Sequence, residues 1–179
     1  MCKCCTIRTK NTTTIYTMEW IKFVLKSIII ILLQVTLFDR LQIQGWGYPM
    51  VYIILLLNLP IQLPRWVEIL IGATVGVVID VCNNSIGVHM ATCTAISFVR
   101  PILLKHAIID VERIKGEINS RSIGRAEYIK CAVILTLAHH FMVFTLEAWS
   151  LQNWWMLILQ TIFSSIITLI IVLGYDMLK

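Results

Sequence analysis

Several ionisable side chains lie in stretches of this 179-residue sequence that are otherwise almost wholly apolar. Asp80 and His89 flank a short polar turn, and Arg100 directly precedes Pro101. A titratable group is costly in apolar surroundings and usually has a partner there. Each of these residues is therefore a candidate for ion binding, for substrate binding or for an internal structural bond.

A second group of ionisable residues consists of His139, His140 and Glu147. Adjacent histidines on a helix point in different directions, so we expect at most one to join Glu147, which lies on the same face as His140. A proton relay or metal centre requires more ligands, and the sequence has no HExxH, GxSxG or Ser-Lys pattern. We expect no catalytic, cofactor-binding or metal-binding residue, and we expect these side chains to bond between helices.

The composition shows what surrounds these residues. Hydrophobic residues make up 58% of the chain and charged residues 14%, and the mean hydropathy is +0.82. About 20 apolar residues in a helix cross a hydrocarbon core, so several crossings fit and a separate soluble domain does not. The sequence predicts an all-α polytopic membrane protein with one transmembrane domain over 18–179 and six spans, at about 20–38, 49–63, 66–82, 86–105, 129–149 and 154–174.

The 49–63 span is the weakest of the six, because its length of about 15 residues is close to that of a re-entrant or tilted segment. Five spans are therefore the alternative. Lysine and arginine gather before the first span and after the fourth, which predicts that the N-terminus and the 106–128 loop are cytoplasmic. The net charge of +5 then reflects topology and contact with anionic membrane lipid, and no motif indicates nucleic acid binding.

Two polar segments lie outside the predicted spans. Residues 1–17 form a tail rich in threonine and cysteine, too poor in ligands for a closed zinc site. Met18 directly precedes the first span, and we expect it to be the native start. The 106–128 loop has apolar residues at helical spacing, so it is either an amphipathic helix on the inner leaflet or a solvated connector.

The polar hairpin between the third and fourth predicted spans has two interpretations. A rise of 1.5 Å per residue places Asp80, Asn83 and His89 near one level at the outer side. In the architectural interpretation, Asn84 or Ser85 caps the next helix, Gly87 permits close packing, and Asp80 accepts hydrogen bonds from amides of the turn. In the other interpretation, the same groups bind an ion or a substrate.

Arg100 lies about 13 residues after Gly87, roughly 20 Å deeper, so we expect no direct pair with Asp80. Its guanidinium is expected to reach lipid phosphates at the inner side, or to bind carbonyls that Pro101 leaves without a helical donor.

Three stretches combine these features in a specific order: LQVTLFDRLQIQGWGYPMVYIILLLNLPIQLPRW, GATVGVVIDVCNNSIGVHMATCTAISFVRPILL and LAHHFMVFTLEAWS. Together they resemble the MreD family of rod shape-determining membrane proteins of bacteria. The likeness runs from about Met18 to the end of the chain. Its most specific pieces are the exit of the first span at Gln34 to Phe38, the pair Tyr48-Pro49, and the series Asp80, Asn84, Gly87, Arg100 and Pro101.

This resemblance implies a non-enzymatic scaffold in the bacterial inner membrane, within the complex that elongates the lateral peptidoglycan wall and maintains rod shape. The implied partners are MreC above all, RodA, a class-B penicillin-binding transpeptidase and, indirectly, the actin-like MreB. The family is also similar in fold to the substrate-binding subunits of energy-coupling-factor transporters. A binding subunit of a vitamin or metal transporter is therefore the alternative function.

The two functions need different surfaces. A scaffold needs faces at lipid depth that other spans recognise, and Gly72 and Gly76 form a Gly-xxx-Gly step that serves either internal packing or contact with a partner. A solute-binding subunit needs a polar pocket at the outer side, which Asp80, Asn83 and His89 would line, but the predicted outer loops are very short.

Overall fold

The computed structural model describes the backbone of residues 3–40, 47–107, 116–148 and 154–178, with side chains from Trp20 onward. The regular elements in these ranges are helices, and none is a strand. The long helices are α1 (Lys3–Thr36), α3 (Arg65–Asn83), α4 (Val88–Ala107), α6 (Arg125–Glu147) and α7 (Trp154–Leu178). The short ones are η1 (Phe38–Arg40), α2 (Ile53–Leu57) and α5 (Ser120–Ile123).

Four of the described helices are long and apolar enough to cross a membrane: Trp20–Arg40, Arg65–Asn83, Arg125–Glu147 and Trp154–Leu178. They coincide with four of the six predicted spans and indicate a membrane protein, so the all-α membrane class is confirmed in this coarse form. Helix α4 occupies the position of the fourth predicted span and has 20 residues. It is less apolar than the four because it carries His89, Arg100 and Lys105.

The helix predicted over 49–63 is wrong, because only Ile53–Leu57 is helical there. Proline fixes its own φ and has no amide hydrogen, so Pro49, Pro60 and Pro64 confine regular structure to the residues between them. We call residues 47–64 the interior segment. Its central part is almost completely buried, at no more than 6% exposure from Met50 to Leu59.

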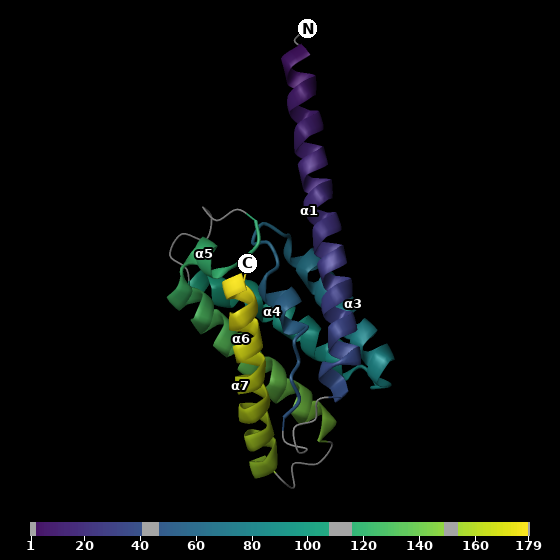
Figure 1. The fold of residues 1–179 in the computed structure, drawn as a ribbon, viewed down its shortest axis with the longest axis vertical. Coiled ribbons are helices and arrows are strands. Elements are labelled where there is room, and N and C mark those ends of the chain that lie inside the picture. The colour runs from purple at the N-terminus through teal and green to yellow at the C-terminus, as the bar shows by residue number, and fades with distance from the viewer. Residues whose placement is uncertain (1–2, 41–46, 108–115, 149–153, 179) are drawn as a thin grey trace.

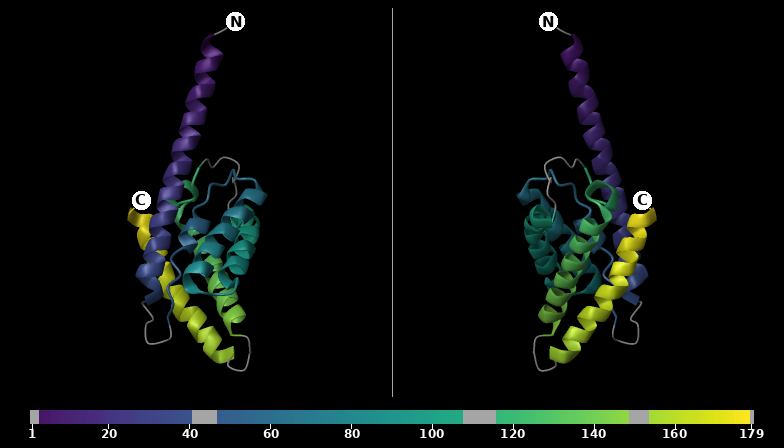
Figure 2. Two further views of the ribbon diagram at one scale, coloured as in Figure 1. Left: turned by 90° about the vertical axis from the view of Figure 1, so that its right-hand side faces the viewer. Right: turned by 90° about the vertical axis from the view of Figure 1, so that its left-hand side faces the viewer.

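The interior segment passes between the long helices (Figure 1). Hydrogen bonds tie its beginning to the end of α1 and to α7, and its end to α4 and the start of α6. Helices α3 and α4 form a closely packed antiparallel hairpin, and α6 and α7 form another (Figures 1 and 2). The core therefore surrounds a stretch of chain that is helical only over Ile53–Leu57, so the backbone groups on either side of α2 need partners from other elements.

Helix α1 begins at Lys3 and continues through the residues before Met18, so the predicted polar tail is helical in residues 3–17. Figure 1 shows this N-terminal half standing clear of the other helices, on the side of the molecule toward which α7 ends. Of the predicted loop helix, Ile108 to Lys115 lie outside the described residues, whereas α5 is a single turn and Ile118 is fully buried.

The Gly72 and Gly76 step lies against α4. A Cβ atom at Gly72 would come within 2.7 Å of the Cys93 carbonyl oxygen, and one at Gly76 within 2.4 Å of the Met90 Cα atom. Both distances are far below van der Waals contact. Of the two uses predicted for this step, internal packing is therefore the one that the structure contains.

Gly87 has a different role from the predicted one. No atom of the described residues lies within 4 Å of the position that its Cβ atom would take, so close packing against them is not its function. Its φ of 74° is a left-handed conformation that favours glycine. Asn84 also has a positive φ, 56°, and ends α3 by donating its amide to the Asp80 carbonyl, so it does not cap α4.

Candidate functional site

Arg100, on α4, is completely buried, with no exposed surface. Its Nη1 donates to Glu68 Oε1 on α3 at 2.9 Å. Its Nε and Nη2 donate to the Leu57 carbonyl oxygen at 3.3 and 3.2 Å, and Nη2 also donates to the carbonyl oxygen of Leu59. The expected contacts with lipid phosphates or with carbonyls that Pro101 leaves free are wrong, because the guanidinium binds the carbonyl oxygens of Leu57, which ends the short helix α2, and of Leu59 just beyond it.

Glu68 was not predicted as a site residue. It lies in the first turn of α3, four residues after Pro64, and is only 2% exposed. The available signal was an unexplained carboxylate at the start of the third predicted span, on the same side of the membrane as Arg100. A buried charge needs a counter-charge at that depth, and Glu68 provides it while Asp80 lies at the other end of α3.

The first amides of the interior segment are bound by polar side chains of α1 and α7. Tyr48 donates its backbone amide to Ser164 Oγ at 3.0 Å, and Met50 donates to Thr168 Oγ1 at 3.1 Å. Gln34 accepts from the Val51 amide at 2.7 Å and donates to the Pro49 carbonyl oxygen at 3.0 Å. These bonds satisfy backbone groups that neither water nor a helix can reach.

Tyr52 connects the interior segment to two histidines. Its hydroxyl oxygen lies 2.7 Å from His89 Nδ1 and 3.0 Å from His139 Nε2. One hydroxyl supplies one donor, so one of the two ring nitrogens must itself carry a proton to complete both bonds. His140 lies 2.9 Å from the Thr136 carbonyl oxygen through Nδ1 and 3.2 Å from Thr168 through Nε2.

His140 is therefore not the partner of Glu147 that the sequence suggested, since α6 turns its ring toward α7. Bonds between helices were the function expected for the histidines. The contact of His140 with Thr168 is of that kind, because it joins α6 to α7, whereas His89 and His139 contact Tyr52 in the interior segment.

Asp80 caps the N-terminus of α4. Its Oδ1 accepts from the His89 amide at 3.0 Å and from Ser85 Oγ at 2.5 Å, and its Oδ2 accepts from the Met90 amide at 2.8 Å. These contacts match the architectural interpretation in kind. The residue that caps α4 differs from the predicted one, because the carboxylate of Asp80 binds the amides that Asn84 or Ser85 was expected to bind. Asp80 meets the backbone of His89, while the ring of His89 turns toward Tyr52.

A cavity of about 330 Å³ lies where the ends of several elements meet. Asp39 follows α1, Asn83 is in the last turn of α3, His89 is in the first turn of α4, and Glu147 ends α6. Its volume is in the range of small-molecule sites. It is lined by Gln34, Phe38, Asp39, Tyr48, Pro49, Met50, Tyr52, Asn83, His89, Phe144 and Glu147.

The cavity unites five residues that the sequence had singled out, Tyr48, Pro49, Asn83, His89 and Glu147. Asp80, Arg100 and Glu68 are not part of the cavity lining. Asp80 binds the backbone amide of His89, and Arg100 and Glu68 lie at the other end of the interior segment. Asp39 was missed as a candidate because it follows the first span, where a carboxylate is ordinarily solvated. Among the described residues, no group of three or more His, Cys, Asp or Glu is arranged to hold a metal ion.

Comparisons of the chain with protein-family models, with curated proteins and with solved structures found no match.

Proposed function

We propose that this chain is a non-enzymatic scaffold of the bacterial inner membrane, within the complex that elongates the lateral peptidoglycan wall. The proposed direct partner is MreC, with RodA and a class-B penicillin-binding transpeptidase in the same complex and MreB connected indirectly. The resemblance of three sequence stretches to the MreD family motivates the proposal, and the packing of α1 supports it.

Helix α1 keeps little of its apolar surface within the fold. Only 11% of its most apolar stretch is buried, against 33 to 44% in the other three candidate spans. Its exposed residues face outward over several turns and include Ile21, Val24, Leu25, Ile28, Ile29, Leu32 and Leu33. Such a face suits a second transmembrane helix, and this observation carries the proposal.

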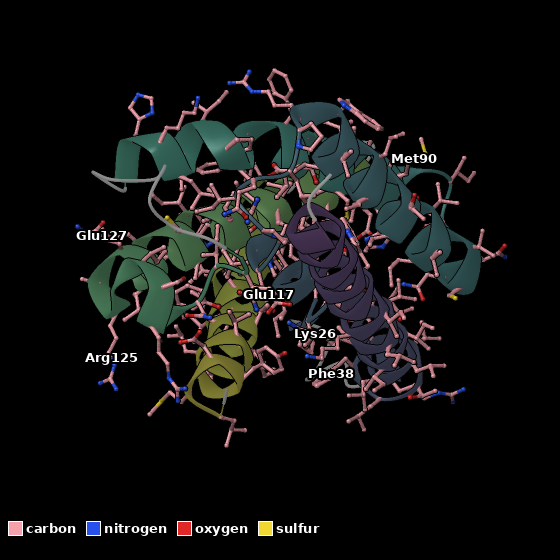
Figure 3. All side chains as sticks on the ribbon, turned by 90° about the horizontal axis from the view of Figure 1, so that it is seen from above. Lys26, Phe38, Met90, Glu117, Arg125 and Glu127 are labelled. Carbon is pink, nitrogen blue, oxygen red and sulfur yellow. The ribbon has the colours of Figure 1, made fainter. Side chains whose placement is uncertain are left out.

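Contacts at two places along α1 nevertheless hold it in position. Lys26 forms an ion pair with Glu117 at 3.3 Å and lies 5.4 Å from the centre of the Tyr175 ring, and Figure 3 shows Lys26 and Glu117 side by side. Toward the end of α1, Gln34 binds the interior segment. Between these two depths, α1 buries Ile30 in the core and exposes its opposite face, so it presents a defined surface to a partner.

The buried polar side chains support a structural function as well. Arg100, Gln34, Ser164 and Thr168 all bind the backbone of the interior segment. Their hydrogen-bonding capacity is directed at holding the fold, which fits a protein that acts through its outer surface.

Six crossings belong to the proposal, with α4 and the interior segment as the two beyond the four apolar helices. This topology places Asn83 outside and Arg121 in the cytoplasm. In a background without cysteine, a membrane-impermeant maleimide applied to intact spheroplasts should label Asn83→Cys and should label Arg121→Cys only after lysis. Labelling of both from the same side would contradict the six-crossing topology.

The alternative function is the substrate-binding subunit of an energy-coupling-factor transporter. One observation favours it, the cavity at the proposed outer end, lined by Asn83, His89 and Glu147.

Affinity purification of the full-length chain from its host in mild detergent separates the two functions. Co-isolation of MreC and RodA is expected, and replacing Ile28 and Leu32 on the exposed face of α1 by tryptophan should reduce it. The matched control replaces Ile166 and Ile170 on α7, which together are at least as exposed as Ile28 and Leu32. Recovery of a pair of transporter ATPases in place of MreC and RodA would refute the scaffold.

A further inference from the structure

We propose that the cavity between the ends of α1, α3 and α6 binds a small organic cation that combines an ammonium group with an apolar or aromatic part. This inference goes beyond the scaffold function and does not rest on it, because a scaffold needs no small ligand. It rests on the charge, the aromatic lining and the exposure of the cavity wall.

The charge of the wall is negative. Asp39 and Glu147 both line the cavity, and the described lining contains no lysine or arginine. Arg40, the nearest basic residue in the sequence, is exposed and is not part of the lining. The sequences 41–46 and 149–153, which follow η1 and α6, contain no charged residue. A cation placed here meets two carboxylates without a competing positive charge.

Asp39 has unused hydrogen-bonding capacity. Its Oδ1 accepts from Gln34 Nε2 at 2.6 Å, whereas its Oδ2 is buried and has no hydrogen-bond partner among the described residues. A buried carboxylate oxygen without a donor is costly. An ammonium group carries three donors and supplies what this oxygen lacks.

The remaining wall is largely aromatic. Phe38, Tyr48 and Phe144 line the cavity, and the rings of Tyr48 and Phe144 form an edge-to-face pair with centroids 6.0 Å apart. Aromatic faces attract cations and also accept apolar groups. Carboxylates beside aromatic rings are the surroundings that recognise amines, whereas a bare metal ion would find too few ligands among the described side chains.

The cavity reaches from the surface to the core. Asn83 and Glu147 are exposed, and Tyr52 and His89, which also line it, are at most 5% exposed. A ligand can therefore enter past Glu147 and contact the hydroxyl and imidazole groups that hold the interior segment. In the proposed topology the entrance faces the outside of the cell.

The test uses three probes of similar shape and different charge: 2-phenylethylamine, 2-phenylethanol and 3-phenylpropionate. Each is titrated into the full-length, detergent-purified protein, with isothermal calorimetry and the melting temperature as measurements. The amine should bind and raise the melting temperature. The alcohol should bind at least tenfold more weakly, and the anion should not bind.

Asp39→Asn and Glu147→Gln keep the shape of the side chain and remove its charge, and each should weaken amine binding about tenfold. Glu127→Gln is the control, because Glu127 pairs with Lys130 near the start of α6 and Figure 3 shows it at the periphery, away from Phe38. The melting temperatures of the unliganded variants establish that they fold.

Three results would overturn the inference: no binding of the amine, equal binding of the amine and the alcohol, or unchanged amine binding by both cavity variants. The second of these would show an apolar cavity without selection for charge. None of the three bears on co-isolation with MreC, so the scaffold and the cation site are tested separately.

Discussion

Arg100 on α4 and Glu68 on α3 form an ion pair at 2.9 Å that is closed to solvent, and the same guanidinium binds the Leu57 and Leu59 carbonyl oxygens. One side chain thus joins three parts of the chain. An ion pair alone gains little when buried, because desolvation offsets the attraction. The hydrogen bonds of Arg100 to the Leu57 and Leu59 carbonyl oxygens add to the stabilisation, because these two oxygens are buried and need donors.

Arg100→Leu should be strongly destabilising, by about 3–5 kcal/mol, because it leaves the Glu68 carboxylate without its counter-charge. Reversible unfolding in mixed micelles with increasing SDS measures the change. Lys130→Leu is the control, since its pair with Glu127 is exposed and contributes at most about 1 kcal/mol. The double variant Arg100→Leu/Glu68→Leu should regain part of the loss but stay below wild type, because the carbonyls remain unmet. Full recovery would show that only the ion pair matters.

Asp80→Ala should destabilise the protein by about 0.5–2 kcal/mol, because the His89 and Met90 amides lose their acceptor. Asp80→Asn keeps one carbonyl oxygen and should lie between alanine and wild type. The same unfolding assay distinguishes these values. Suppose that Asp80→Asn disturbs cell shape as strongly as Asp80→Ala but lowers the stability of the protein less. The charge of Asp80 would then have a function beyond capping α4.

Thr168→Val removes the acceptor of the Met50 amide at nearly constant volume and should cost about 1–3 kcal/mol. Thr74→Val is the matched change, because Thr74 is exposed and, within the part of the chain that the structure describes, its hydroxyl bonds only to the Leu70 carbonyl oxygen of its own helix. Hydrogen exchange of the Met50 amide provides a direct measurement, and it should accelerate in the Thr168 variant alone. Equal effects of the two substitutions would argue against a specific tie between α7 and the interior segment.

Gly76→Ala should separate α3 from α4, because the new methyl group would overlap the Met90 backbone, and overpacking typically costs about 1–3 kcal/mol. The new methyl group of Gly174→Ala on α7 would have no described atom within 4 Å, so this change should be neutral or stabilising by up to about 1 kcal/mol through helix propensity. The unfolding midpoint of Gly76→Ala should therefore fall, whereas that of Gly174→Ala should rise or stay unchanged. A neutral Gly76→Ala would show that the hairpin packs more loosely than the glycine contacts require.

The four apolar helices and the polar turn could be predicted from the sequence, because both are local properties. Apolar length defines a candidate span. The run from Asp80 to His89 contains the turn residues that end one helix and start the next. The depth of Arg100 relative to Asp80 also followed from helix rise alone, and the structure pairs Arg100 with Glu68.

The interior segment could not be predicted in the same way. Its apolar residues have the composition of a short span, and a local pattern does not show that the backbone is irregular within the fold. Its conformation depends on Gln34, Ser164, Thr168 and Arg100, which come from three different helices. Only the tertiary structure brings these side chains to the backbone amides and carbonyls of the interior segment that have no partner within a helix.

The sequence by itself determined that this chain is an all-α membrane protein with a polar hairpin and an arginine far from Asp80, because hydropathy, turn chemistry and helix rise act over a few residues. Only the tertiary structure decided what those polar groups bind and where a cavity forms. Asp39 and Glu147 are more than 100 positions apart and lie on one cavity wall because α1 and α6 end at the same level. A buried polar group is satisfied only by a hydrogen bond or an ion pair at contact distance, so its partner is set by which helices meet.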